Sequence, residues 1–131
     1  MEGKLKHLDL IQGVINRMAS NSFSLTNWTV VLVSALFALS AKYSDTSFIP
    51  IAFLPVSAFW LLDGYYLRQE RLYRKLYDRV RKQQEPEIDF SMNTSEFFED
   101  VDPWIYVCFS KTLLVFHGFI ALTITVGIFL I

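Results

Sequence analysis

The chain has 131 residues, of which 53% are hydrophobic, and its formal net charge is −1. A chain of this length forms one domain. The only cysteine, Cys108, excludes an intrachain disulfide and a cysteine-based zinc site. No GxGxxG, P-loop, HExxH or GxSxG motif is present, and His7 and His117 have no acid and nucleophile near them in the sequence. These absences predict a protein that is not an enzyme and that binds no metal and no cofactor.

Residues 1–24 have the pattern of an amphipathic helix. Leu8, Ile11, Ile15 and Met18 recur at spacings of three and four, which places them on one helix face. This face is expected either to lie on a bilayer or to pack against another helix of the chain.

Residues 26–41 are predicted to form the first membrane span. The apolar stretch WTVVLVSALFALSA begins at Trp28, a residue type that favours the membrane interface, and no charge occurs from Ala19 to Ala41. Asn27 and Ser34 share one helix face at heptad spacing with Ala41, and Ala38 lies beside them. Small and weakly polar residues on one face indicate either close helix packing or the lining of a narrow pore.

Residues 48–63 are predicted to form the second span, FIPIAFLPVSAFWLL followed by Asp63. Pro50 suits a helix start, whereas Pro55 is expected to kink the helix because it has no N–H. An acid at the end of a span is costly unless it is paired or hydrated. Arg17 and Lys111 are the expected ion-pair partners of Asp63, and a ring of such acids at a pore mouth is the alternative.

Residues 64–84 continue the second span without a turn signal, as a basic helix. Its bases fall mainly on one face, and tyrosines border that face; the candidate ligand-binding residues are Arg68, Arg71, Arg74, Lys75, Arg79, Lys82, Tyr73 and Tyr77. Such a cluster attracts anionic lipid headgroups. Arginines that pair with phosphate and tyrosines that stack on bases also fit a nucleotide or an oligonucleotide.

Residues 85–103 contain acids and no base, so they are expected to shield the basic helix or cap its end. Residues 110–131 are predicted to form the third span. From Thr112 this segment has no charge, and at about 1.5 Å per residue it reaches about 30 Å, the hydrocarbon thickness of a bilayer.

The distribution of Lys and Arg predicts the orientation. Bases precede the first span, follow the second and open the third, whereas the turn between spans one and two holds only Lys42. The positive-inside rule then places the N-terminus, the basic helix and the acidic segment in the cytoplasm, and the C-terminus in the periplasm. The predicted fold is an all-α membrane protein with three transmembrane helices, an N-terminal amphipathic helix and a cytoplasmic continuation of the second span.

The stretches IQGVINRMASNSF, NWTVVLVSALFALSA and FWLLDGYYLRQERLYRKLY resemble small bacterial membrane proteins encoded beside defence systems, such as the transmembrane effectors of the Hailong antiphage system. The resemblance implies a homo-oligomeric ion channel of the bacterial inner membrane. It also implies a partner nucleotidyltransferase whose short deoxyadenylate oligomers, a single-stranded ligand, hold the channel closed. Infection would release the channel and depolarise the cell. No binding residue is carried over from the family.

Two functions follow as hypotheses. The first is a channel subunit that assembles from several copies, because three helices cannot enclose a wide aqueous path, and that a nucleic-acid-like ligand gates from the cytoplasm. The second is a non-conducting anchor or scaffold whose cytoplasmic helix recruits a protein partner. Only the first would depolarise a membrane.

Overall fold

The computed structural model describes residues 2–45 and 47–130 of the chain. Within these residues all regular structure is helical, which confirms the all-α prediction. The elements are α1 (Glu2–Tyr43), α2 (Phe48–Ile51), α3 (Phe53–Lys82), the 3₁₀ turns η1 (Glu85–Glu87) and η2 (Ser95–Phe97), α4 (Trp104–Cys108) and α5 (Lys111–Leu130). Three segments are long and apolar enough to cross a membrane: α1, Phe48–Lys82 and α5.

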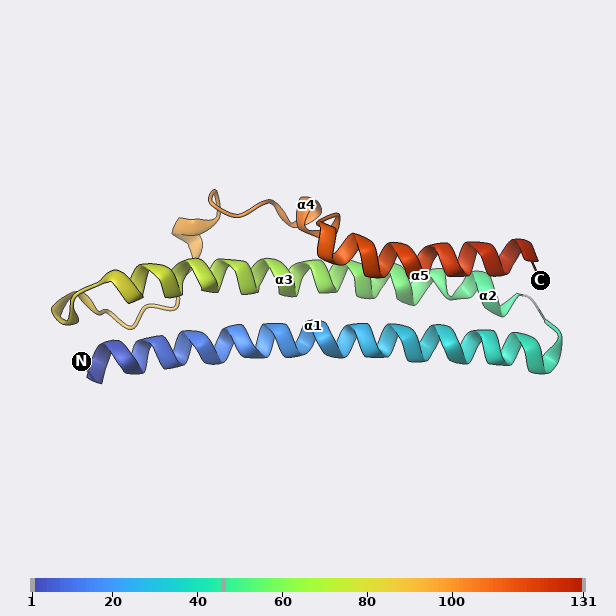
Figure 1. Cartoon of the computed structure of the whole chain (residues 1–131), viewed down its shortest axis with the longest axis horizontal. Helices are drawn as coiled ribbons and strands as arrows, with labels where there is room; N and C mark the ends of the chain where they lie inside the picture. The colour runs from blue at the N-terminus through green and yellow to red at the C-terminus, as the bar shows by residue number, and fades with distance from the viewer. Residues whose placement is uncertain (1, 46, 131) are drawn as a thin grey trace.

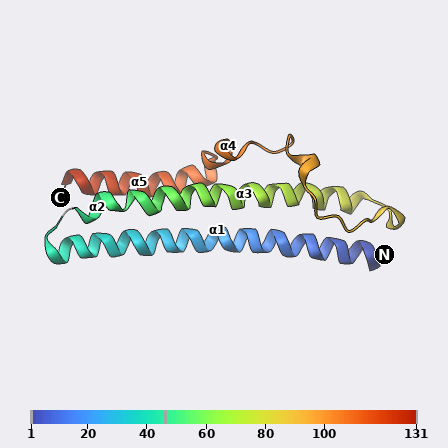
Figure 2. The same cartoon turned by 180° about the vertical axis from the view of Figure 1, so that it is seen from behind.

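The two longest helices lie side by side in opposite directions and form a hairpin (Figures 1 and 2). Helix α5 lies along the part of α3 nearest α2. The linker between α3 and α4 starts at the end of α3 that lies beside the chain's N-terminus and runs back along the other part of α3 to α4. The hairpin therefore has a three-helix half, which contains the apolar segments, and a second half made of two helices and the linker.

Helix α1 is a single helix of 42 residues, about 63 Å long. The segments expected as an amphipathic helix at 1–24 and a span at 26–41 both belong to this one helix, which continues unbroken through residue 25. No proline interrupts this part of α1, and contacts with α3 support it on both sides of the expected boundary. The expected continuity from residue 63 into the basic segment is observed, since α3 runs unbroken from Phe53 to Lys82.

A break separates α2 from α3 at Ala52. Pro55 lies three residues later, and its ring and missing N–H disfavour a regular helix over the preceding turn. The backbone N–H of Ala52 instead bonds the Ile49 carbonyl at 3.0 Å, a shorter 3₁₀-type connection. The kink expected at Pro55 is therefore present as a short interruption just before it.

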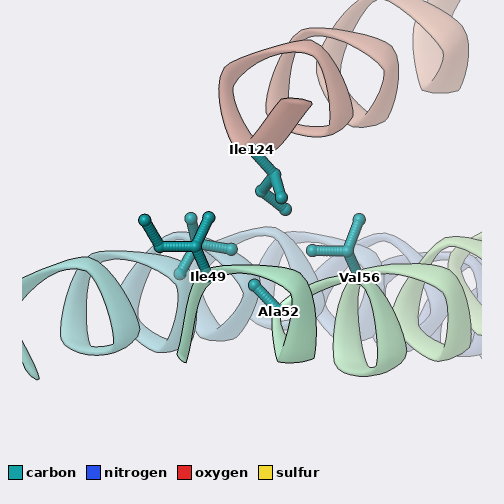
Figure 3. Packing of buried hydrophobic residues seen from close by; sticks show 5 residues of the cluster. Ile49, Ala52, Val56 and Ile124 are labelled. Atoms are coloured by element: carbon teal, nitrogen blue, oxygen red, sulfur yellow. The ribbon is translucent and has the colours of Figure 1, made fainter. Parts of the chain in front are cut away.

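Two separate apolar cores hold the hairpin together. In the three-helix half, Ile49, Ala52 and Val56 pack with Val33 of α1 and Ile124 of α5 (Figure 3). Tight packing of such side chains is the main attraction between helices inside a bilayer, where burial from water adds little.

In the other half, Ile11 and Ile15 of α1 are buried against Leu76 and Val80 of α3. The amphipathic face at residues 8–18 was expected to contact either a bilayer or another helix of the chain. In the structure it packs against another helix, α3. Residues of the linker, Ile88, Met92 and Phe97, complete this core.

A glycine allows α4 to approach α3 closely. A Cβ added at Gly64 would collide with the Cys108 sulfur atom. Two indole N–H groups hold α4 in place: Trp60 Nε1 donates to the Cys108 carbonyl at 2.6 Å, and Trp104 Nε1 donates to the Leu61 carbonyl at 2.9 Å. This contact fixes where α5 begins relative to α3.

Gly64→Ala should destabilise the fold by about 1–3 kcal/mol, because the added methyl overpacks the contact with Cys108. Thermal unfolding in mild detergent measures the loss, and Cys108→Ala in the same chain should restore part of it. Gly13→Ala is the matched control, since a Cβ there meets nothing within 4 Å and alanine favours a helix. Equal effects of the two glycine substitutions would contradict the close-approach account.

Candidate functional site

The predicted ligand-binding residues all lie on α3, but they do not form one open surface. Tyr73 and Tyr77 are half-buried and pack against the core around Ile11 and Leu76, so their rings are largely occupied. Tyr77 also borders a surface cavity, where it lies with Gln12 and basic residues of α3. We call the bases Arg68, Arg71, Arg74, Lys75, Arg79 and Lys82 the basic face.

Residues 85–102, which we call the acidic strap, fold back over the basic face. Arg79 forms an ion pair with Glu96, and its guanidinium lies 5.7 Å from the centre of the Phe97 ring. Arg68 Nε donates to the Asp102 carbonyl at 3.1 Å, and its guanidinium lies 5.2 Å from the centre of the Phe98 ring. The strap therefore occupies both ends of the basic face, as the charge pattern led us to expect.

Between these two attachments lies a surface cavity of about 310 Å³. Bases of α3 line one side and the strap lines the other; the lining residues are Arg71, Arg74, Lys75, Asp78, Asp100, Val101 and Asp102. Three cations line this cavity beside three carboxylates, so an anion can bind the cations only where it replaces acidic side chains. Because Asp100 and Asp102 already share it, a polyanionic ligand has to compete with the strap.

Local hydrogen bonds shape the rest of the strap. His7 Nε2 lies 2.8 Å from the Ser91 carbonyl, and the carboxylate of Glu85 accepts hydrogen bonds from the N–H groups of Gly3 and Lys4. The N–H of Ser91 donates to Asp89, which lowers the pKa of that carboxyl, and the charge of Arg79 lowers it further. A lowered pKa favours the folded strap at neutral pH, and this contribution is lost as the pH falls through the lowered value.

A second polar site lies inside the three-helix half. Asp63 is 1% exposed, and its Oδ2 lies 2.8 Å from His117 Nε2 of α5. Its other carboxylate oxygen accepts a hydrogen bond from Ser22 of α1. The Trp60 ring stacks on the imidazole, with 5.6 Å between ring centres. We call Ser22, Asp63 and His117 the buried polar cluster.

This cluster corrects the expected pairing of Asp63. The structure gives it Ser22 and His117 as partners in place of Arg17 or Lys111, both of which are exposed. Burial of its carboxylate within one chain also argues against an acid at a pore mouth. A signal was present in the sequence, because Asp63 and His117 are isolated ionisable residues in two different apolar segments, and such residues usually pair.

The order of the bonds limits what the cluster does chemically. In a hydrolase triad the histidine lies between the serine and the acid, so that it removes the serine proton. Here Asp63 lies between Ser22 and His117, and both bonds go to its carboxylate. The histidine does not activate the hydroxyl, and the arrangement instead joins three helices through one acid.

The residues proposed as pore lining lie on the outside of the hairpin. Asn27, Ser34 and Ala38 are exposed on α1. They belong to a longer row at alternating spacings of three and four, every member of which is exposed; it comprises Ser20, Ser24, Asn27, Val31, Ser34, Ala38 and Ala41. We call this row the α1 polar face, and no other segment of residues 2–45 and 47–130 covers it in the single chain.

No protein-family model matches the chain, and neither does any curated protein or solved structure.

Proposed function

We propose that the chain is the subunit of a homo-oligomeric channel that depolarises a bacterial inner membrane. The observation that carries this proposal is the α1 polar face. It runs along an apolar helix long enough to cross a bilayer, yet it presents hydroxyl and amide groups outward. Such groups are costly against lipid and are usually found in helix contacts or facing water.

The heptad spacing of the face supports assembly of several copies. Residues at alternating spacings of three and four form a seam along which helices pack at a small crossing angle. Small side chains such as Ser34 and Ala38 let helices approach closely. A ring of copies meeting near these seams would place Asn27 and Ser34 beside a narrow central path.

The positive-inside rule orients the proposed subunit. The two-helix half contains the basic face together with Lys4, Lys6 and Arg17. This half would project into the cytoplasm as a rigid extension of the spans. The short connection at residues 44–47 and the end of α5 would lie on the periplasmic side. In this placement α3 connects the cavity between the basic face and the acidic strap directly to the helices inside the membrane.

A single-stranded oligonucleotide or nucleotide is the proposed ligand of the basic face. The converging side chains of Arg71, Arg74 and Lys75 supply the charge, and the acidic strap supplies a competitor that a polyanion would displace. The half-buried tyrosines leave little ring surface for base stacking, so phosphate contacts would dominate. Displacement of the strap would move α4 and the start of α5, which gives the ligand a mechanical route to the spans.

The resemblance to Hailong-type effectors supports a role in antiphage defence and a partner nucleotidyltransferase as the source of the ligand. Anionic membrane lipid is the competing ligand for the same bases. A non-conducting anchor that recruits a protein partner is the alternative function, and in it the α1 polar face would serve helix packing alone.

Induced expression of the chain without its ligand-producing partner should depolarise bacterial cells, measured with a potential-sensitive dye. Asn27→Leu combined with Ser34→Leu should abolish the depolarisation while membrane insertion is retained, because the path loses its polar groups. Thr123→Leu is the matched control, since it removes an exposed hydroxyl from α5. An unchanged potential with the wild-type chain would favour the anchor.

Changing Arg71, Arg74 and Lys75 together to Gln should weaken binding of a short single-stranded DNA at least about tenfold, or about 1.4 kcal/mol. The salt dependence should fall by about two in log–log slope, given about 0.7 per phosphate contact on a single strand. Fluorescence anisotropy in detergent measures both quantities.

Lys4, Lys6 and Arg17 changed together to Gln form the control, because the same number of charges is removed from α1, away from the cavities beside the basic face. Equal losses in the two triple variants would show that binding follows total charge alone. If the variant of Arg71, Arg74 and Lys75 lost binding to anionic vesicles but kept its binding to single-stranded DNA, the basic face would be a lipid site.

A further inference from the structure

Helix α4 and the residue after it turn large apolar side chains away from the bundle. Val107 and Cys108 are buried, whereas the outward residues are all exposed and apolar or aromatic, and Tyr106 is 68% exposed. We call these outward residues the α4 apolar patch: Trp104, Ile105, Tyr106 and Phe109. Large apolar side chains gathered on one exposed surface mark a contact with a membrane or with another protein.

The α4 apolar patch lies where the neighbouring helices change from apolar to charged. The two indole bonds hold α4 beside residues 60–64 of α3. No charge occurs at residues 48–62, and after the buried Asp63 the next charged residue is Arg68. Helix α5 begins with Lys111 and has no other Lys, Arg, Asp or Glu. If the three apolar segments cross a bilayer, α4 therefore lies at its surface, where Trp and Tyr are favoured.

Two apolar grooves lie between α3 and α4 beside this patch, and Leu61 lines both of them. In the larger groove, of about 540 Å³, α4 contributes Trp104. In the smaller one, of about 180 Å³, the residues from the α4 side are Cys108 and Phe109. The other lining residues come from α3 and are Ser57, Ala58, Trp60, Leu62 and Tyr65.

The chemistry of the grooves favours a hydrocarbon chain over a protein partner. The indole N–H groups of Trp60 and Trp104 both donate to carbonyls within the chain, and the lining hydroxyl groups belong to Ser57 and Tyr65. A peptide in the grooves would lose hydrogen bonds to water and regain few of them, which is costly, whereas an acyl chain has none to lose.

The grooves are also continuous with the outer surface of an apolar segment that is long enough to cross a membrane. Leu54 lies seven residues before Leu61, on the same face of α3, and is 76% exposed. Lipid that covers Leu54 in a bilayer would therefore reach the grooves along one helix face.

We propose that the α4 apolar patch and the two grooves form a phospholipid-binding surface. Helix α4 lies at the boundary between headgroups and acyl chains, and acyl chains occupy the grooves. Lys111, which is exposed two residues after Phe109, lies at the level of the lipid phosphates. The membrane thereby holds the end of the acidic strap that leads into α4. The surface requires only that the three apolar segments cross a bilayer, so it does not depend on conduction or on a ligand of the basic face.

Nitroxide labels measure the depth of α4 in vesicles of phosphatidylethanolamine and phosphatidylglycerol. Ile105→Cys places a label on the patch of a Cys108→Ala chain, and Phe119→Cys on α5 and Glu99→Cys on the strap are the membrane and water references. Power saturation compares collisions with oxygen, which concentrates in hydrocarbon, and with a nickel chelate, which stays in water. With labelled chains diluted in unlabelled ones, the oxygen-to-chelate ratio should be severalfold higher at Ile105→Cys than at Glu99→Cys, and close to that at Phe119→Cys.

A charge on the patch should lift α4 out of the membrane, because an acid in hydrocarbon is costly. Ile105→Asp should lower the oxygen-to-chelate ratio of a label at Phe109→Cys toward the water reference. Ser95→Asp is the matched control, since it adds the same charge at an exposed position of the strap and should leave that ratio unchanged.

Two results with the Ile105→Cys label would overturn the proposal. One is the low oxygen-to-chelate ratio of the water reference. The other is a label that neither reagent reaches, which a second copy covering the patch would produce. An unchanged Phe109→Cys label in the Ile105→Asp chain would also overturn it.

Discussion

The antiparallel packing of α1 on α3 positions both candidate sites. The apolar residues at one end of the pair, around Ile11 and Leu76, hold the basic face in a folded two-helix unit. Those at the other end, around Val33 and Val56, bring α5 and α2 into the same bundle. Without the first contact the basic part of α3 would be an isolated helix, which is only marginally stable in water.

Because α3 is unbroken over 30 residues, it links two chemically different environments. Near one end, bases face an acidic strap and a cavity of about 310 Å³. Near the other, Asp63 joins three helices in an apolar region. The strap leads directly into α4, and α4 is fixed to α3 through Gly64 and the two indole bonds. Displacing the strap therefore acts on the same short helix that determines where α5 begins.

Local sequence patterns predicted much of the fold. The apolar segments, the continuity of α3 and the helical face at residues 8–18 all follow from spacing of apolar side chains and from the absence of turn signals. The strap was expected because opposite charges are separated along the chain, and its ion pair between Arg79 and Glu96 agrees with that expectation.

Other features depend on contacts between distant segments. The continuity of α1 past residue 24 is such a feature, since polar residues at 20–24 resemble a helix end until α3 is seen beside them. The partners of Asp63 were predicted wrongly because charge alone favoured Arg17 and Lys111. Helix rotation instead points these two outward and brings Ser22 and His117 inward. The half-burial of Tyr73 and Tyr77 could not be predicted from the sequence either, because it also depends on how α1 packs against α3.

In the proposed channel, copies of the chain meet through the α1 polar face. Oxidative cross-linking in native membranes tests this, with Ser34→Cys introduced into a Cys108→Ala chain. Phe119→Cys, exposed on α5, provides the comparison. We predict that Ser34→Cys gives covalent dimers in high yield and that Phe119→Cys does not. Absence of dimers from Ser34→Cys, together with efficient cross-linking through Phe119→Cys, would contradict assembly through α1.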